Sequence, residues 1–441
     1  MATLTGSLNA ILKDFYSGPV RDQLNNEMLA LQLFRKRKLT WVGRQAIMPV
    51  RLARNTSDAF LDESEAFPGA GSVGYGTYTV SAKYLYGQMS ITGPAIAQAK
   101  ASVGAFVNGL QSELDGAVET VKNASDEALF IGGGCIGFLN EQVLQGGAHD
   151  WQFSGNADRL PVVAGPITAV NARIMRCDTF ADITPAGAFT VQATITPAGS
   201  LSPGRITIDQ ALTTAGVPAG VPCAVIVEKW TDGAAGAATS KQPTGMYSGI
   251  AGGDFVVGGA TAPTYFANVR STAANEPLRG TALTQSLTVG AANRADLTVR
   301  RLQSVIDEIS TRSGAMPDCL IAHYILRQEY AALLANNLQL DVKTAAGKGD
   351  AGFNMGMLSF NGIPLKTSRH CGKGLLIFIK TDSWIMAEVV PPGLADLDGN
   401  VLQRASNSDA YSAFVRYYYN TVCEHPNKNG ILVGLNFSGA V

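Results

Sequence analysis

The chain has 441 residues, a length that suits about two to four folding units. Its 34 basic and 35 acidic side chains leave a formal net charge of −1, which argues against a protein that holds nucleic acid mainly by neutralising phosphates. Only 16% of the residues are charged, where soluble domains usually have about 25%. A chain so poor in charge is expected to bury surface against copies of itself. Its 46% apolar content excludes a disordered chain.

Targeting signals are absent from the sequence. No apolar run approaches the roughly 18 residues of a membrane span, and Met1–Phe15 lacks the basic start and apolar block of a secretory signal. The cysteines are widely spaced and form no C-x-x-C pair, which is typical of reduced, buried thiols in a protein made in a cytoplasm. They are Cys135, Cys177, Cys223, Cys319, Cys371 and Cys423.

Residues 1–40 are predicted to form an N-terminal arm that contains an amphipathic helix. Leu24, Met28, Leu31 and Phe34 recur at three- and four-residue steps and so share one helical face. We expect this arm to contact neighbouring chains, and we expect a chain without residues 1–38 to fold but not to close an assembly.

Two blocks of opposite charge follow each other. The basic stretch contains Arg35, Lys36, Arg37, Lys38, Arg44, Arg51 and Arg54, and the acidic block contains Asp58, Asp62, Glu63 and Glu65. The basic stretch can contact the acidic block of a neighbouring chain, contact nucleic acid, or form a solvated charged face. We rank the neighbouring chain above nucleic acid because the opposite charges are adjacent in sequence. Such a charge match would set register more than it would add affinity.

A long β-hairpin is predicted between residues 41 and 92, with strands at Gln45–Leu52 and Tyr75–Met89 and a glycine-rich turn at its tip. Pro49 confines the first strand to an edge position. Alternation in the second strand predicts one shared face for Tyr78, Val80, Ala82, Tyr84 and Tyr86. An isolated two-stranded ribbon is only marginally stable in water, so we expect this one to need a partner.

A long helix is predicted from Ala95 to Phe130, after the helix-start signal Thr92-Gly93-Pro94 and before the glycines that begin at Gly132. A straight helix of this length would measure about 54 Å. The glycines within it indicate either close packing or a break into two ordinary core helices: Gly104, Gly109 and Gly116. Its apolar stripe contains Val103, Val107, Leu110, Leu114, Val118 and Val121.

The rest of the chain divides into three parts. Residues 151–232 predict a small inserted β unit, with strands at Ala188–Thr196, Arg205–Ile208 and Cys223–Val227. Residues 233–365 predict a mixed α/β domain, with helices at Ala295–Ile309 and Leu326–Leu334 around a strand at Cys319–Ala322. Residues 366–441 return as strands at Leu375–Ile379, Trp384–Val389, Ser412–Cys423 and Ile431–Leu435.

Catalytic motifs are missing, so we predict a protein that is not an enzyme, with no catalytic, cofactor-binding or metal-binding residues. The four histidines are not accompanied by a G-x-S-x-G motif, and no glycine-lysine segment has the phosphate-binding P-loop frame. His370-Cys371 and Cys423-x-His425 resemble zinc ligand pairs but lack the usual spacing, so buried thiols are favoured over a metal. Asp396–Asn400 resembles a calcium loop but lacks its regularly spaced oxygens and closing glutamate, so a tight turn is favoured.

Several segments, in this order, resemble the major capsid proteins of tailed bacteriophages, whose HK97-like fold is shared by encapsulin shells. Tyr86-Gly-Gln-Met-Ser-Ile-Thr-Gly-Pro-Ala-Ile-Ala97, continued by Ala99–Val107, is similar to the passage from the extended loop into the spine helix. Ser359-Phe-Asn-Gly-Ile-Pro-Leu365 resembles the start of the family's late strands. Leu375–Glu388, Asp409–Pro426 and Gly430–Gly434 are similar to the strands that follow.

The resemblance implies an α+β, HK97-like capsid fold. Its parts would be an N-terminal arm (1–40), an extended loop (41–92), a peripheral domain with the spine helix (93–150), an inserted β-rich domain (151–232), an axial domain (233–365) and returning strands of the peripheral and axial domains (366–441). Copies would form the hexamers and pentamers of an icosahedral virion shell, made in a host cytoplasm, that encloses double-stranded DNA without sequence-specific binding or a membrane.

The resemblance also implies partners: portal and scaffolding proteins, and a decoration protein. The scaffold is expected to be a separate chain because the arm and loop occupy everything before the spine helix. Some relatives are cross-linked through a loop lysine, but Lys83 lies on the return strand, so no cross-link is predicted. The alternatives are an encapsulin-like nanocompartment shell and a virion tail or decoration protein.

Overall fold

The computed structural model separates the described chain into two compact units. Unit 1 takes its described residues from 87–120 and 393–415, and unit 2 from 27–86, 121–392 and 416–441. The residues that the structure describes are 28–34, 37–41, 43–55, 57–93, 103–130, 132, 135–145, 148–155, 167–168, 172–176, 190–191, 204–208, 223–227, 231–232, 239–252, 264–266, 268–270, 273–284, 296–335, 358–372, 374–396, 402–404, 409–433 and 435.

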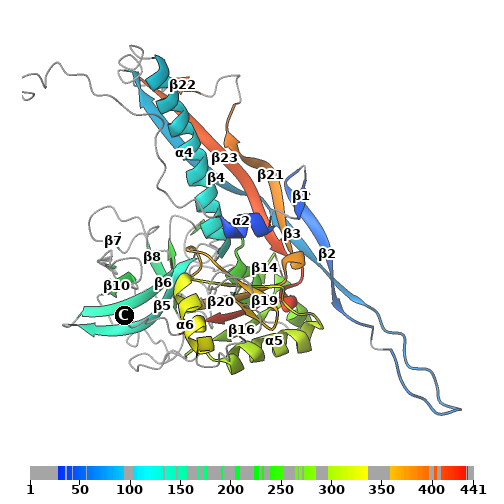
Figure 1. The fold of residues 1–441 in the computed structure, drawn as a ribbon. Helices are drawn as coiled ribbons and strands as arrows, with labels where there is room; N and C mark the ends of the chain where they lie inside the picture. Colours follow the sequence, from blue (N-terminus) through cyan, green and yellow to red (C-terminus); the bar gives the residue numbers. More distant parts are fainter. Residues whose placement is uncertain are drawn as a thin grey trace, which may run out of the picture. The chain divides into compact units, whose positions relative to one another are not determined.

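A six-stranded mixed sheet forms the core of unit 2 (Figure 1). Two pairs within it are parallel, β16 with β24 and β17 with β19, and the remaining pairs are antiparallel. In order across the sheet the strands are β16 (Thr281–Thr284), β24 (Gly430–Val433), β20 (Leu375–Ile379), β17 (Cys319–Ala322), β19 (Ile363–Thr367) and β18 (Ser359–Phe360). Every residue of β17 and β20 is buried, which explains why the sequence shows them as unbroken apolar runs.

Two helices pack against this sheet, α5 (Val299–Ser313) and α6 (Tyr324–Ala335). The predicted helix at 295–309 is confirmed with a shift of four residues. The start is set by Thr298, whose side chain accepts a hydrogen bond from the Arg301 backbone nitrogen at 3.3 Å. The end is set by Gly314, which has φ 68° and donates its N–H to Ser310. The apolar face of α5 is buried in the core: Leu302, Val305, Ile306 and Ile309.

A separate five-stranded antiparallel sheet lies in the β-rich region, in the order β10-β6-β5-β11-β8. The predicted strands at 205–208 and 223–227 are present, whereas only Thr190–Val191 of the strand predicted at 188–196 lies within the described residues. The sheet begins before the predicted domain boundary at Trp151. Its strands are β5 (Cys135–Gln145), β6 (Ala148–Gly155), β8 (Ala172–Arg176), β10 (Gly204–Ile208) and β11 (Cys223–Val227).

Part of the predicted N-terminal arm belongs to the body of unit 2. The helix α2 (Leu29–Phe34) buries four of its six residues, and β1 (Lys38–Thr40) pairs in parallel with β21 (Trp384–Leu394). The Leu31 backbone nitrogen donates to the buried carboxylate of Asp126 at 2.8 Å. This packing contradicts the expectation that a chain without residues 1–38 still folds. Leu24 lies outside the described residues.

Some elements begin in one unit and end in the other: β4 (Lys83–Thr92), α4 (Val103–Phe130), β21 and β23 (Ala410–Cys423). The start that we predicted for the long helix, at Ala95, lies outside the described residues. From Val103 onward α4 continues through all three glycines, so the two-helix alternative is wrong. A Cβ at Gly116 would meet no atom within 4 Å, so close packing does not explain that glycine either.

Within unit 1, hydrogen bonds connect parts of the described segments 87–93 and 393–415. The Gly93 N–H donates to the Asp409 carbonyl at 2.7 Å, and the Ala395 N–H donates to the Phe414 carbonyl at 2.9 Å. The strand β22 (Gln403–Arg404) pairs antiparallel with the first part of β23.

Candidate assembly interface

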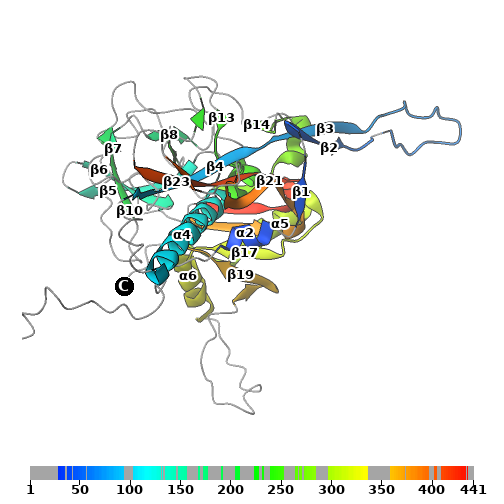
Figure 2. The ribbon, with the colours of Figure 1, turned by 90° about the horizontal axis from the view of Figure 1, so that it is seen from above.

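The predicted hairpin exists as an antiparallel ribbon of β2 (Gln45–Ala53) and β3 (Gly74–Ser81). Within the described residues β2 pairs with β3 alone, so Pro49 lies on an edge strand as predicted, directly opposite Thr77. Figures 1 and 2 show the ribbon and its loop projecting from the rest of unit 2. Beyond its base, the ribbon therefore offers unpaired strand edges to other molecules.

The base of the ribbon is fixed by buried side chains. Tyr78 and Val80 are fully buried, and the Tyr78 ring contacts that of Tyr265 edge to face at 5.4 Å between centroids. Burial raises the pKa of Tyr78 well above its ordinary value, so its hydroxyl stays protonated. The amide of Asn268 donates to the Thr77 carbonyl at 2.9 Å. The amide of Asn420 donates to the Ser81 carbonyl at 2.8 Å.

The single shared face predicted for Tyr78 through Tyr86 is wrong. Tyr78 is buried, but Tyr84 and Tyr86 are 64% and 57% exposed. The cause is a strand interruption at Ala82: β3 ends at Ser81 after pairing with β2, and β4 then pairs with β23. Each strand meets its own partner, and the buried positions change from even to odd residue numbers across the break.

The charged residues predicted as inter-subunit contacts lie mostly on the ribbon and its loop. Within the part of the chain that the structure describes, no ion pair joins the basic stretch to the acidic block, so these charges are open to other molecules. Arg35 and Lys36 lie outside the described residues, and of Lys38 only the backbone in β1 is described. The exposed members are Arg44, Arg51, Arg54, Asp58, Asp62, Glu63 and Glu65.

Arg37 has a partner in its own chain. Its guanidinium forms an ion pair with Glu424 at 3.0 Å and also donates to the Asp382 carbonyl. The Arg37 carbonyl accepts a hydrogen bond from the Met386 backbone nitrogen at 2.9 Å. These contacts connect the segment between α2 and β1 to β21 and to the end of β23, so Arg37 has a structural role within unit 2.

The loop at the tip of the ribbon exposes large apolar side chains among its acidic residues. Phe60 and Phe67 are the most exposed, at 109% and 92%, and Leu61 is 39% exposed. The loop is ordered locally by a turn in which the Glu65 N–H donates to the Asp62 carbonyl at 3.1 Å. In return the Glu65 carboxylate accepts from the Asp62 N–H at 3.1 Å. The exposed apolar side chains make this loop a candidate contact surface.

A second exposed aromatic group lies beyond the base of the ribbon, where β4 runs beside β23. Tyr418 contacts both Tyr84 and Tyr86 edge to face, at 5.0 and 5.7 Å between centroids. The Tyr86 hydroxyl donates to the Tyr418 hydroxyl at 3.0 Å, and this hydrogen bond raises the pKa of Tyr86 to about 12. The nearby positive charge of Arg416 acts in the opposite direction and lowers the pKa of Tyr86. We call these four residues the tyrosine patch.

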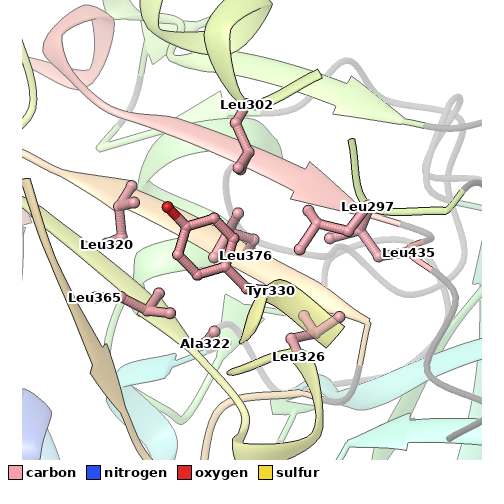
Figure 3. A pocket seen from close by; sticks show the side chains of 9 residues that line it. All are labelled: Leu297, Leu302, Leu320, Ala322, Leu326, Tyr330, Leu365, Leu376 and Leu435. Atoms are coloured by element: carbon pink, nitrogen blue, oxygen red, sulfur yellow. The ribbon is translucent and has the colours of Figure 1, made fainter. Parts of the chain in front are cut away.

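A cavity of about 10 Å³ lies in the core of unit 2, and Figure 3 shows its nine lining side chains. It has room for about one water molecule, and its walls are apolar except for Tyr330, whose hydroxyl donates to the Ser359 carbonyl at 2.8 Å. The cavity is therefore a packing gap with no group to orient a substrate. Among the described residues no cluster of His, Cys, Asp and Glu could hold a metal ion, and no helix is long and apolar enough to cross a membrane.

Comparison with known proteins identifies the fold. No protein-family model matches the chain, and no curated protein matches it in sequence. The capsid asymmetric unit of cyanophage A-1(L) matches over 98% of this chain and 99% of its own, with a TM-score of 0.59 at 9% sequence identity. The chain has the fold of a phage capsid protein. The resemblance predicted from the sequence is thereby confirmed at the level of the fold.

Two further solved structures match at lower TM-scores. The structure named Mycobacterium phage Adephagia matches with a TM-score of 0.45 and 12% identity, covering 99% of this chain and 98% of its own. The holo-SrpI encapsulin complex from Synechococcus elongatus matches with a TM-score of 0.43 and 8% identity, covering 100% and 99%. The fold assignment rests on the cyanophage capsid alone.

Sequence reasoning missed the aromatic residues of the candidate interface. Phe60 and Phe67 carried a signal, because they are isolated large apolar residues in an acidic, glycine-rich loop without helix or strand periodicity. The contact between Tyr86 and Tyr418 carried none, because it depends on which strand β4 pairs with.

Proposed function

We propose that this chain is the major capsid protein of a tailed phage, and that its copies form the hexamers and pentamers of an icosahedral shell around double-stranded DNA. The fold shared with the cyanophage capsid along 98% of the chain carries this proposal. The ribbon supports it, because Phe60 and Phe67 are left in water by their own chain. Covering these side chains in an assembly would remove apolar surface from water and so favour association.

The proposal assigns contacts between neighbouring chains to the extended loop. The exposed basic residues of one copy (Arg44, Arg51 and Arg54) would face the exposed acidic residues of the next (Asp58, Asp62, Glu63 and Glu65). Arg35, Lys36 and Lys38 are the remaining proposed members. Complementary charges of this kind steer association and suppress wrong register. The six-stranded sheet of unit 2 would belong to the axial domain at the capsomer centre.

The near-neutral net charge of −1 agrees with a container, since a shell that held DNA tightly would hinder packaging and release. The partners that we propose are a portal protein, a separate scaffolding protein and a decoration protein. The assembled chain would reside in the virion after synthesis in the host cytoplasm.

Electron microscopy of the full chain, expressed alone and then with a scaffolding protein of the same genome, tests this proposal. Closed shells or ring-shaped capsomers are expected. A chain that stays monomeric at high concentration under both conditions contradicts the proposal. The contents of shells purified from infected cells separate a DNA-filled head from an encapsulin-like shell, which would enclose a protein cargo.

Charge reversal tests the role of the two blocks. Arg51→Glu with Arg54→Glu, and separately Asp62→Lys with Glu63→Lys, should each reduce the yield of particles at least tenfold at low salt. Combining all four changes should restore much of the yield, because the opposite charges face each other again. Lys366→Glu in β19, outside both blocks, is the matched control. Normal yield from both reversed variants would contradict the charge contact.

A further inference from the structure

The tip loop and the tyrosine patch have matching chemistry. The tip presents Phe60 and Phe67 within the acidic block, and no basic residue occurs between Arg54 and Lys83. The patch presents the edges and faces of three tyrosines beside the positive charge of Arg416. An apolar aromatic centre with opposite charges at its border is the composition of a protein–protein contact.

The ribbon keeps the two surfaces of one chain apart. The paired part of the ribbon spans seven residue steps from Ser81 to Gly74, about 24 Å, before the tip loop begins. The chain returns from the tip along β3, passes the buried base at Tyr78 and reaches Tyr84 only beyond Ala82. The tip and the patch therefore lie at opposite ends of a paired segment and are available to different copies.

We propose that Phe60 and Phe67 of one copy dock on Tyr84, Tyr86 and Tyr418 of a second copy, so that Arg416 of the second copy joins its basic stretch in facing the acidic block of the tip. This inference rests on the proposed function and names both sides of one of its contacts. The contact is heterologous, because each copy contributes a different surface, so its repetition generates rings or open chains. Buried aromatic residues with an arginine beside them are the residue types that dominate the binding energy of interfaces.

The hydrogen bond between Tyr86 and Tyr418 prepares the patch for this contact. The bond at 3.0 Å and the edge-to-face contacts of Tyr418 with both neighbours hold the three rings in one arrangement before binding. Little side-chain freedom then remains to be lost when a phenylalanine enters, which favours association. Tyr86→Phe removes the hydrogen bond and keeps the ring, so it should weaken association less than Tyr86→Ala.

Photo-cross-linking of the full chain locates the contact. With photoreactive p-benzoylphenylalanine at position 60, irradiation should join two copies, and peptide mapping should find the bond within 84–86 or 416–418. The same replacement at Val299, an exposed position on α5, is the control and should not label those segments. Cross-links from position 60 to another surface would overturn the inference.

Mixing two damaged chains tests that the surfaces belong to different copies. Phe60→Ala with Phe67→Ala removes the aromatic rings of the tip and leaves the tyrosine patch intact. Tyr84→Ala with Tyr86→Ala removes two rings of the patch and leaves the tip intact. Each chain alone should associate at least tenfold more weakly than the natural chain. Their mixture should form heterodimers and nothing larger, since each pair retains one intact contact. Unfolding midpoints close to the natural value show that the exposed substitutions leave the fold intact.

A charge exchange adds a second readout. Arg416→Glu should weaken association, and adding Glu63→Lys to the same chain should restore it at least in part. Full association of Arg416→Glu, or of both aromatic variants, would overturn the inference while assembly itself continued. A natural chain that neither associates nor cross-links with its scaffold present would contradict the proposed function as well, so the two failures are distinguishable.

Discussion

Phe34 stacks on Trp384 with their ring centroids 4.7 Å apart and their planes 13° from parallel. The two residues come from α2, near the N-terminus, and from the first position of β21, and both rings are almost completely buried. This contact holds the segment that precedes the extended loop against the body of unit 2. It explains why α2 and β1 fold with their own chain.

Phe34→Ala should lower the free energy of unfolding by about 3–5 kcal/mol, because it removes a buried aromatic side chain and leaves a cavity beside Trp384. Urea unfolding followed by tryptophan fluorescence measures the change. Gln32→Ala, at the exposed position of the same helix, should change stability by less than about 0.5 kcal/mol. Equal effects of the two substitutions would show that α2 is not anchored by this stack.

Asn429 should be among the least replaceable polar residues of the described chain. Its buried carbonyl oxygen accepts from the Lys380 backbone nitrogen at 2.8 Å and from the Trp384 indole at 3.2 Å. Asn429→Ala leaves both donors buried without this acceptor, which should cost about 3 kcal/mol or more. Asn429→Asp keeps the accepting oxygen but loses the NH2 group that donates to the His425 carbonyl and the Ser383 hydroxyl. This variant should therefore not restore stability. A loss below about 1 kcal/mol in urea unfolding of the alanine variant would contradict this role.

Two glycines, one in the interior of α4 and one just after its end, should respond oppositely to alanine. Gly116→Ala should stabilise the protein by up to about 1 kcal/mol, because a Cβ meets open space in the interior of α4. Gly132→Ala should destabilise it strongly, because Gly132 has φ 69° and a Cβ would collide with the Gly245 backbone nitrogen. Thermal unfolding midpoints compare the two variants. A stabilising Gly132→Ala would show that the backbone there differs from this structure.

Stability should fall in alkaline solution through two buried thiols. Burial raises the pKa of the Cys423 thiol to about 12 and the pKa of the Cys371 thiol well above its ordinary range. Above about pH 8.5 the unfolded chain loses thiol protons that the folded chain keeps. This contribution to stability is therefore complete below about pH 8.5, and for Cys423 it is lost as the pH rises toward 12. Each thiol should lower the free energy of unfolding by about 1.4 kcal/mol per pH unit in that window.

Urea titrations at pH 7.5, 8.5 and 9.5 measure this slope below the ordinary tyrosine pKa of about 10. Cys371→Ala should reduce the slope by the contribution of one thiol, about 1.4 kcal/mol per pH unit. A thiol reagent at pH 8 should label neither cysteine until the chain unfolds. An unchanged slope in the variant would mean that Cys371 ionises equally in the folded and unfolded states.

The sequence predicted β17 and β20 of the six-stranded sheet closely because both strands are buried on both faces. Their apolar runs at 319–322 and 375–379 have the same bounds in the structure. The helix α5 begins at Val299, later than predicted, because of its N-cap. The Thr298 hydroxyl accepts a hydrogen bond from one of the free N–H groups in the first turn of the helix. Such choices between neighbouring positions involve small energies that periodicity does not reveal.

The residues of the candidate interface also divide into those that the sequence predicted and those that it did not. The sequence by itself determined the hairpin, its charged blocks and the long helix, because alternation, charge order and helical spacing are properties of adjacent residues. Only the tertiary structure decided that Tyr84 and Tyr86 turn outward, that Arg37 pairs with Glu424 and that Phe34 stacks on Trp384. Each of these depends on which distant strand a segment meets, and that pairing is selected by the free energy of the whole fold rather than by local pattern.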